Sequence, residues 1–103
     1  MREFYDRCYE IVKKIPKGKI STYMDVANAL GTKASRAVGT AMKKNQDKNV
    51  PCHRVINSDG FVGGYNGLVG NKIDALREEG VKVIDGYIDL KKFRYDFFGK
   101  EYK

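Results

Sequence analysis

Apolar residues recur at helical spacing near the amino terminus. In residues 3–14 the apolar face consists of Phe4, Cys8, Ile11 and Val12, and charged residues occupy the opposite face. This period predicts an amphipathic helix that packs against a core along one side. Cys8 lies within the apolar stripe, so we interpret it as a core residue rather than a reactive one. The segment Pro16-Lys17-Gly18 should end the helix and turn the chain.

A second periodic stretch begins with a helix-capping pattern. Thr22 is followed three residues later by Asp25, which is the spacing of a capping box, and Gly31 is a suitable stop for the short helix between them. Only Thr32 and Lys33 separate this helix from a further helical stretch at about residues 34–44. Two short helices joined this tightly predict a helix-turn-helix.

The carboxyl-terminal third predicts one more helix and a hairpin. Residues 69–79 place Ile73 and Leu76 on one face and stop at Gly80. Residues 81–84 and 87–90 have the pattern of two short strands, joined by the dipeptide Asp85-Gly86 that is typical of two-residue turns. The predicted fold is therefore mainly α with a small β-hairpin, an α+β domain of the winged helix-turn-helix type.

Length and composition favour a single intracellular domain. The chain of 103 residues is long enough for one modest core. We expect this core in residues 1–90, followed by a tail over residues 91–103 whose order the sequence leaves open. Two cysteines do not make a disulfide framework of the secreted kind, and no apolar run has the length of a signal peptide or membrane span. We expect a cytoplasmic monomer with no membrane association, no cofactor and no metal.

Charge indicates a class of partner. The net charge of +7 favours a nucleic acid or another polyanion. The helix at about 34–44 has one apolar face, and its opposite face carries Lys33, Arg36, Thr40, Lys43 and Lys44. Such a stripe on the second helix of a helix-turn-helix is typical of DNA contact. A solvated lysine face is the alternative; the small inward residues favour DNA, because they let the helix dock closely.

The segment Val50–Ile56 holds the only histidine of the chain, directly after one of its two cysteines. A thiol reacts as the thiolate, which a neighbouring imidazole or cation can stabilise. Successive side chains of an extended chain point to opposite sides, so Cys52 and His53 can be coupled only through a turn, a water or a third group. Taken alone, the pair is more typical of a buried cysteine beside a core histidine.

The residues Pro51-Cys52-His53-Arg54-Val55-Ile56-Asn57 resemble the active-site motif of O6-alkylguanine-DNA alkyltransferases. Further matches follow in family order along residues 4–84, at Ile15–Tyr23, Arg36–Met42 with Asn45, Gly63–Gly67 and Glu78–Gly80. The resemblance implies a DNA-repair protein whose partner is double-stranded DNA containing O6-alkylguanine. The alkyl group would pass irreversibly to a cysteine, once per protein molecule.

The resemblance also implies roles for individual residues. Cys52 would be the nucleophile and His53 its base through a water. Glu79 would orient the imidazole, as the acid of a catalytic triad does. Asn45 would fix the cysteine segment by hydrogen bonds, and Tyr23 would give a proton to the departing guanine.

An alkylated guanine must leave the duplex stack before it can react. The resemblance implies that Arg36 fills the gap left by the flipped base, while its helix enters the minor groove. The extruded base would be received by a glycine-rich loop and a supporting lysine, with binding residues Val62, Gly63, Tyr65, Asn66, Gly67 and Lys72.

The chain departs from the family pattern in places. The family's usual additional amino-terminal domain has no match here, Gln46 stands where proline normally follows the hinge asparagine, and the match fades beyond Leu90. Related alkyltransferase-like proteins bind damage without repairing it, and they carry tryptophan where this chain has Cys52. Three other functions therefore stay open: damage binding without transfer, a winged-helix transcription regulator, and a cysteine hydrolase that turns over repeatedly.

Overall fold

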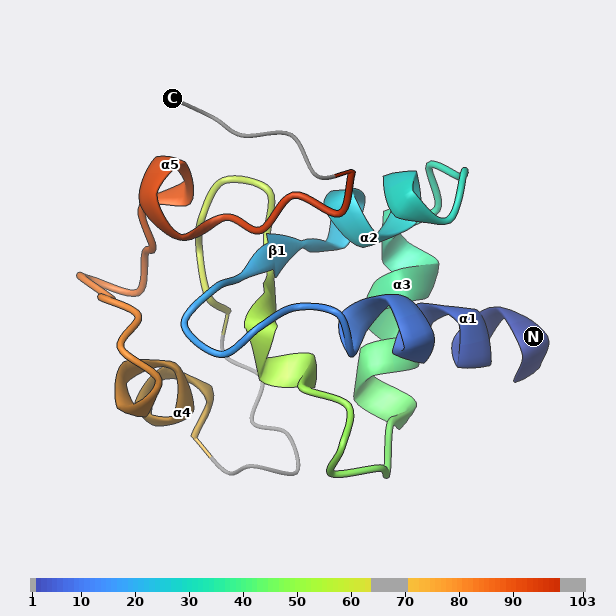
Figure 1. Ribbon diagram of the computed structural model, residues 1–103, viewed down its shortest axis with the longest axis horizontal. Coiled ribbons are helices and arrows are strands. Elements are labelled where there is room, and N and C mark those ends of the chain that lie inside the picture. Colours follow the sequence, from blue (N-terminus) through green and yellow to red (C-terminus); the bar gives the residue numbers. More distant parts are fainter. Residues whose placement is uncertain (1, 64–70, 99–103) are drawn as a thin grey trace.

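Helices form most of the structure, and two short strands join them. The computed structural model describes residues 2–63 and 71–98 (Figure 1). In chain order the elements are α1 Arg2–Val12, β1 Ser21–Thr22, α2 Tyr23–Ala29, α3 Ser35–Lys44, the 3-10 turn η1 Cys52–Arg54, β2 Val55–Ile56, α4 Lys72–Glu78 and α5 Leu90–Phe93. The predicted mainly α architecture is confirmed, but its regular sheet is a parallel pair in which Ser21 lies beside Val55 and Thr22 beside Ile56.

The two strands lie between two apolar clusters. Val55 packs in the first cluster, with buried residues of α1, α2 and α3. Ile56 packs in the second cluster, with Leu76 of α4 and with Val62. Successive side chains of a strand point to opposite faces, so β2 contributes to both clusters. Figure 1 shows the same division, with α1, α2 and α3 on one side of the strands and α4 and α5 on the other. Residues immediately before β2 are therefore held by both halves of the domain.

The helix-turn-helix forms as the capping pattern predicts. The Thr22 side chain accepts a hydrogen bond from the Asp25 backbone N–H, and the Asp25 carboxylate accepts one from the Thr22 N–H, both at 3.0 Å. Helix α2 ends before Gly31, and α3 packs directly against it. Ala34 differs from the expectation, since it precedes α3 and is exposed instead of lying on the apolar face.

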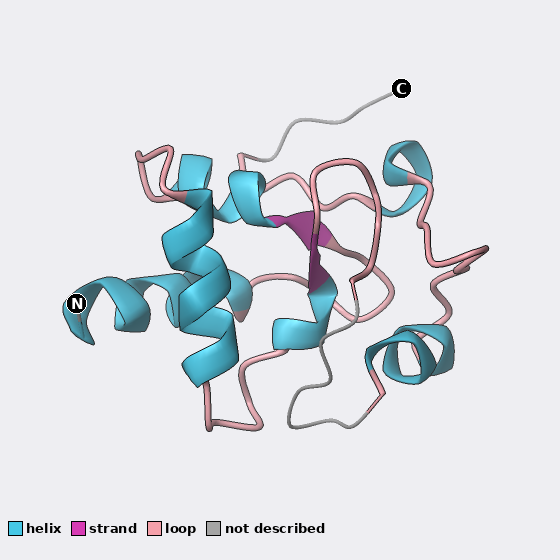
Figure 2. Ribbon diagram, turned by 180° about the vertical axis from the view of Figure 1, so that it is seen from behind, coloured by secondary structure: helices cyan, strands magenta, loops and turns pink. Residues whose placement is uncertain are grey.

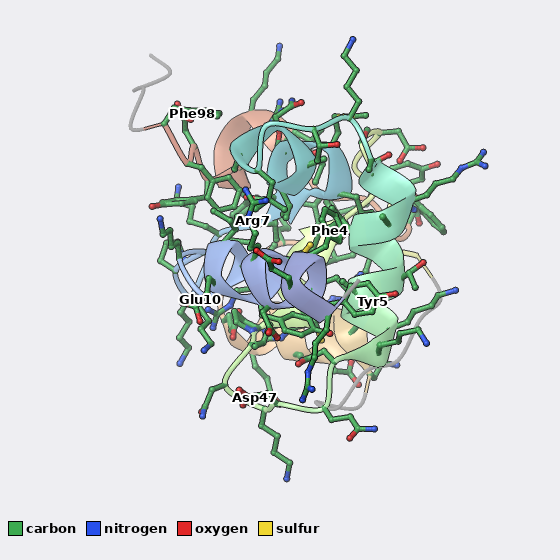
Figure 3. The ribbon with its side chains drawn as sticks, turned by 90° about the vertical axis from the view of Figure 1, so that its right-hand side faces the viewer. Phe4, Tyr5, Arg7, Glu10, Asp47 and Phe98 are labelled. Atoms are coloured by element: carbon green, nitrogen blue, oxygen red, sulfur yellow. The ribbon has the colours of Figure 1, made fainter. Side chains whose placement is uncertain are left out.

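Helix α1 covers the helix-turn-helix with its apolar side. Cys8 and Val12 are buried, and the Tyr9 hydroxyl donates a hydrogen bond of 2.8 Å to the Ala41 carbonyl of α3. Arg7 and Glu10 lie on the exposed side of the helix (Figure 3). None of the helices in the described ranges has the length and apolar character needed to cross a membrane.

The predicted hairpin forms only around its turn. Asp85 and Gly86 do form the two-residue turn, with φ of 53° and 83°, and Ile84 and Tyr87 exchange two backbone hydrogen bonds across it. Beyond this bridge the second limb turns away, because the Ile88 N–H donates to the Gly60 carbonyl and the Val62 N–H donates to the Gly86 carbonyl. The Asp85-Gly86 turn, which takes the place of the wing in a winged helix-turn-helix, is therefore hydrogen-bonded to residues 60–62. Two predicted helix limits also shift, since α1 ends at Val12 and α4 begins at Lys72, after the cap residue Asn71.

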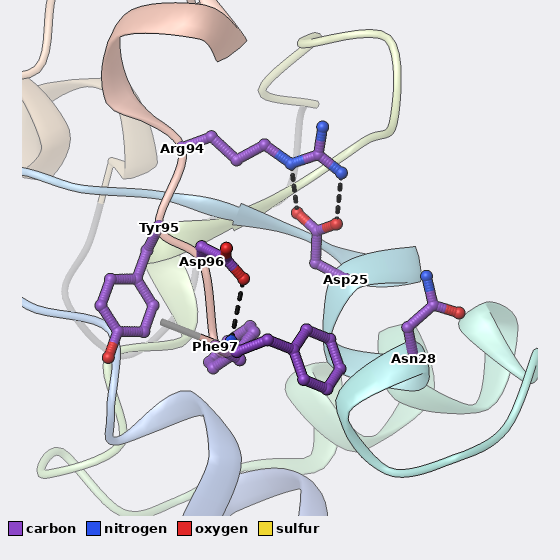
Figure 4. A pocket seen from close by; sticks show the side chains of 7 residues that line it. Asp25, Asn28, Arg94, Tyr95, Asp96 and Phe97 are labelled. Carbon is purple, nitrogen blue, oxygen red and sulfur yellow. Dashed lines mark hydrogen bonds and ion pairs between the residues drawn. The ribbon is translucent and has the colours of Figure 1, made fainter. Parts of the chain in front are cut away.

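The segment after α5 packs along the helix-turn-helix. The Ile20 N–H donates to the Phe93 carbonyl, and the Tyr95 N–H donates to the Ile20 carbonyl. The Arg94 guanidinium pairs with both oxygens of Asp25, the capping residue of α2. A small pocket lies between α2 and residues 94–98 (Figure 4). Residues 91–98 are thus built onto the same domain, and Tyr95 and Phe97 pack on its first cluster.

Candidate functional site

Cys52 begins a tight turn that also contains His53. The Cys52 N–H donates to the Val50 carbonyl at 2.8 Å, and the Arg54 N–H donates to the Pro51 carbonyl at 2.9 Å. Pro51 supplies the fixed φ that this bend needs, at −78°. Because the backbone from Cys52 to Arg54 turns as a 3-10 helix, the two neighbouring side chains are not forced to opposite sides. Cys52 is buried, with an exposed fraction of 6%.

His53 is paired with Glu79, as the family resemblance implies. Its Nε2 lies 3.0 Å from Glu79 Oε2, and both side chains are largely buried. Burial alone would raise the pKa of Glu79, but hydrogen bonds and charges from Arg54 and His53 outweigh it, so the pKa lies below its usual value. An ionised carboxylate only accepts hydrogen bonds, so Nε2 carries the hydrogen, and in the neutral imidazole Nδ1 is then the acceptor. This Nδ1 is buried and has no hydrogen-bond partner within the described ranges.

Glu79 reaches the imidazole from the end of α4. It is the carboxyl-terminal cap of that helix, and Gly80 follows it with φ of 89°, a conformation that glycine adopts without strain. Helix α4 packs directly on the η1 turn. The helix stop that the sequence predicts at Gly80 is therefore also what brings this carboxylate to the site.

Arg54 belongs to the site although the sequence assigned it no role. Its Nε and Nη2 donate to the two Glu79 oxygens at 2.8 and 2.6 Å, and its Nη1 donates to the Ile15 carbonyl at 2.8 Å. The motif contains this arginine, but nothing local indicates that its partner is a carboxylate 25 residues further along the chain.

Lys72 is buried and contacts the segment that contains Cys52. Its Nζ donates a 2.7 Å hydrogen bond to the Val55 carbonyl and lies 5.7 Å from the centre of the Tyr23 ring. Burial lowers the pKa of Lys72 to about 8, while the nearby Cys52 acts in the opposite direction. The structure therefore joins Lys72, Tyr23 and the cysteine segment, three parts that are far apart in the sequence.

The lowered pKa of Lys72 predicts a pH-dependent stability. Between about pH 8 and 10.5 the unfolded lysine still binds a proton that the folded one has released. The free energy of unfolding contributed by Lys72 should therefore rise with pH across this window, by about 1.4 kcal/mol per pH unit at most. We expect the Lys72→Met variant to lose stability relative to the wild type between pH 7 and pH 10, measured by chemical denaturation. A difference between the two proteins that does not vary with pH would contradict this.

Asn45 holds the connection between α3 and the cysteine. Its side chain is buried, and its Nδ2 donates to the carbonyls of Asp47 and Val50 at 3.0 and 3.5 Å. Its Oδ1 accepts from the Asp47 N–H at 3.0 Å. Val50 in turn accepts the Cys52 N–H, so Asn45 lies one hydrogen bond away from the cysteine backbone.

The basic face of α3 is exposed along the helix. Val38, Ala41 and Met42 are buried, and the residues on the open side are Arg36, Thr40, Lys43 and Lys44, with Lys33 just before the helix. Figure 2 shows α3 at the front of the molecule when it is viewed from behind. The structure therefore leaves this face open to a large partner.

The expected base-binding residues are described only in part. Val62 is buried in the second cluster, and Gly63 has φ of 89°. Tyr65, Asn66 and Gly67 lie outside the described residues.

These features define a helix-turn-helix domain with a basic, exposed second helix and a buried cysteine beside a histidine–glutamate pair. Over residues 3–81 the chain matches the family described as "6-O-methylguanine DNA methyltransferase, DNA binding domain". The chain belongs to this family, which confirms the resemblance seen in its motifs.

Relatives of known name fall into more than one class. The chain is 42% identical over 102 residues to a bifunctional methyltransferase/endonuclease of Picrophilus torridus, covering 97% of this chain and 34% of that protein. It is also 42% identical to alkyltransferase-like protein 1 of Schizosaccharomyces pombe, covering 81% of each. Thus the chain spans about a third of the length of the bifunctional relative.

Solved structures include an alkyltransferase-like protein and a methyltransferase. The crystal structure of S. pombe Atl1 with damaged DNA containing O6-carboxymethylguanine has a TM-score of 0.82 and 36% identity, covering 93% of this chain and 97% of that one. The O6-methylguanine-DNA methyltransferase of Pyrococcus kodakaraensis has a TM-score of 0.65 and 44% identity, covering 76% and 46%. The fold of this chain is therefore the fold of both classes.

Proposed function

We propose that the chain repairs DNA by transferring an alkyl group from O6-alkylguanine to Cys52. One observation carries the proposal: Cys52 starts the same turn as His53, whose Nε2 is paired with Glu79 and whose Nδ1 is left as an acceptor. A thiol needs such a base nearby to react as thiolate. Alkyltransferase-like proteins carry tryptophan at this position, so the cysteine favours transfer over binding alone.

The proposed reaction is a single displacement at the alkyl carbon. The Cys52 sulfur forms a bond to the alkyl carbon while the bond between that carbon and guanine O6 breaks. The thiol proton passes through a water to Nδ1 of His53, and the departing guanine takes a proton from Tyr23, so a neutral base leaves. The product thioether has no easy route back to thiol, which makes each molecule react once.

The base reaches the cysteine by leaving the duplex. We propose that α3 enters the minor groove and that Arg36, near its amino-terminal end, occupies the space of the flipped nucleotide. The guanidinium of arginine can stack and donate hydrogen bonds at once, which suits it to that space. Structural neighbours that were solved in complex with DNA support contact between this domain and DNA.

The stoichiometry of transfer tests the proposal. With an excess of duplex carrying a labelled O6-methylguanine, label on the protein should level off at one methyl group per molecule. Continued release of product would instead indicate a hydrolase. A duplex that binds without any transfer would indicate damage binding alone, the second candidate, which the likeness to Atl1 over 97% of that chain favours.

Binding to DNA should weaken steeply with salt. Lys33, Arg36, Lys43 and Lys44 form an exposed cationic stripe, and each phosphate contact releases counterions from the DNA. Four such contacts predict a loss of roughly 100-fold in affinity between about 50 and 200 mM salt. Fluorescence anisotropy with a labelled duplex measures it. An affinity that stays flat over this range would show that the stripe does not contact phosphates.

A further inference from the structure

We propose that Arg54 is a positioning residue of the site, which fixes the Glu79 carboxylate for His53 and balances its charge. The proposal rests on the proposed function for its catalytic consequence, but its electrostatic part stands on the geometry alone. Nothing in the family resemblance assigned a role to this arginine.

The hydrogen bonds of Glu79 show how Arg54 holds it. Arg54 occupies Oε1 with its Nε and shares Oε2 with the imidazole, through Nη2 at 2.6 Å and His53 Nε2 at 3.0 Å. Such a two-point contact between a planar guanidinium and a carboxylate fixes the orientation of the carboxylate as well as its place. Without Arg54 the Glu79 side chain would keep only its contact with His53 Nε2, and one contact leaves the carboxylate free to rotate.

A third hydrogen bond ties the arginine itself to the scaffold. Its Nη1 donates to the Ile15 carbonyl at 2.8 Å, in the connection between α1 and β1. Ile15 is buried in the first apolar cluster. Arg54 therefore joins three separate parts of the chain at the site: the α1–β1 connection, its own η1 turn and the end of α4.

The charge of Arg54 has a consequence for the base. Among the described residues, the charged groups placed at the imidazole are Arg54 on its own turn and Glu79 from α4, while Lys72 of α4 acts on the neighbouring Cys52. An unbalanced carboxylate beside an imidazole favours the protonated imidazolium, which cannot accept a proton from the thiol. A carboxylate already paired with a guanidinium favours it much less, so Arg54 favours the neutral imidazole that can act as the base.

Removing the charge of Arg54 should therefore change the pH dependence of transfer. In Arg54→Gln, the acid limb of the pH–rate profile should move up by about one pH unit, and transfer on that limb should slow about tenfold. Arg54→Lys keeps the charge but loses the planar fork, so its acid limb should stay near that of the wild type. A purely structural role would lower the rate of both variants without moving either limb.

A double-substitution test shows whether Arg54 acts through Glu79. In the Glu79→Gln background only the direct repulsion between the guanidinium and the imidazolium remains, so adding Arg54→Gln should move the limb clearly less than it does in the wild type. An equal shift with and without the carboxylate would overturn the proposal. Arg54→Met, a second neutral variant, serves if Arg54→Gln does not fold, as judged by circular dichroism.

Nuclear magnetic resonance separates this proposal from the proposed function. His53 is the only histidine of the chain, so its imidazole signals are unambiguous during a pH titration. Their midpoint should lie higher in Arg54→Gln than in the wild type, and the difference should be smaller in the Glu79→Gln background. Equal midpoints in the wild type and Arg54→Gln would overturn the role of Arg54. Absence of transfer in the wild type, with the midpoints still apart, would overturn the proposed function alone.

Discussion

Replacing Cys52 with serine should abolish alkyl transfer while leaving DNA binding nearly unchanged. A serine hydroxyl is far harder to ionise than a thiol, so the displacement should slow by roughly a thousandfold or more. The basic face of α3 is not touched by this substitution, and therefore the affinity for duplex should stay within about twofold. Transfer is measured with a labelled methyl group on O6-methylguanine, and binding by fluorescence anisotropy.

Cys8 provides the matched control for this experiment. Its side chain is fully buried in α1, and burial raises the pKa of its thiol to about 11. The Cys8→Ser variant should keep full transfer but lose about 1–3 kcal/mol of stability, because a hydroxyl replaces a thiol in the core. Transfer that survives in Cys52→Ser, or disappears in Cys8→Ser at a temperature where the protein is folded, would contradict the assigned nucleophile.

Replacing Arg36 with alanine should harm repair of duplex DNA much more than reaction with free O6-alkylguanine. Extruding a base costs a few kcal/mol, and the arginine is assigned the task of holding the extruded state. Losing most of that support should slow duplex repair by roughly 10- to 100-fold, whereas a free base needs no extrusion. Single-turnover rates on the two substrates, taken at saturating duplex, measure the difference.

Lys33 is the matched control for Arg36. It is exposed beside the start of α3 and carries the same charge, but it is assigned only a phosphate contact. Lys33→Ala should weaken duplex affinity and its salt dependence, with little change in the rate at saturation. Equal losses of Arg36→Ala on the duplex and on the free base would instead place Arg36 in folding or in the base pocket.

Local patterns were sufficient to predict four of the helices, but not α5, which lies across the expected second strand and tail. Capping boxes, glycine stops and apolar periodicity act within one or two turns, so α1, α2, α3 and α4 were found with shifts of a few residues at their ends. The hairpin forms only at its turn, because its second limb pairs with a more distant segment. Gly86 and Ile88 are hydrogen-bonded to residues 62 and 60, and no turn signal can show which of two segments is the better match.

The site required more than local pattern. The family motif brought Cys52, His53 and Glu79 together, and the structure shows the His53–Glu79 pair. The partners of Arg54 and the burial of Lys72 depend on packing between distant segments, and long charged side chains are usually exposed. The burial of a lysine or arginine is therefore seen in the fold, and its neighbours in the sequence do not predict it.

Intact-protein mass spectrometry tests the central claim most directly. The wild-type chain is incubated with excess duplex containing O6-methylguanine, and peptide mapping then locates any added group. We predict that the whole population gains the mass of one methyl group in place of one hydrogen, and that the group lies on the peptide containing Cys52. An unchanged mass after saturating exposure, or a methyl group on Cys8, would contradict the proposed mechanism.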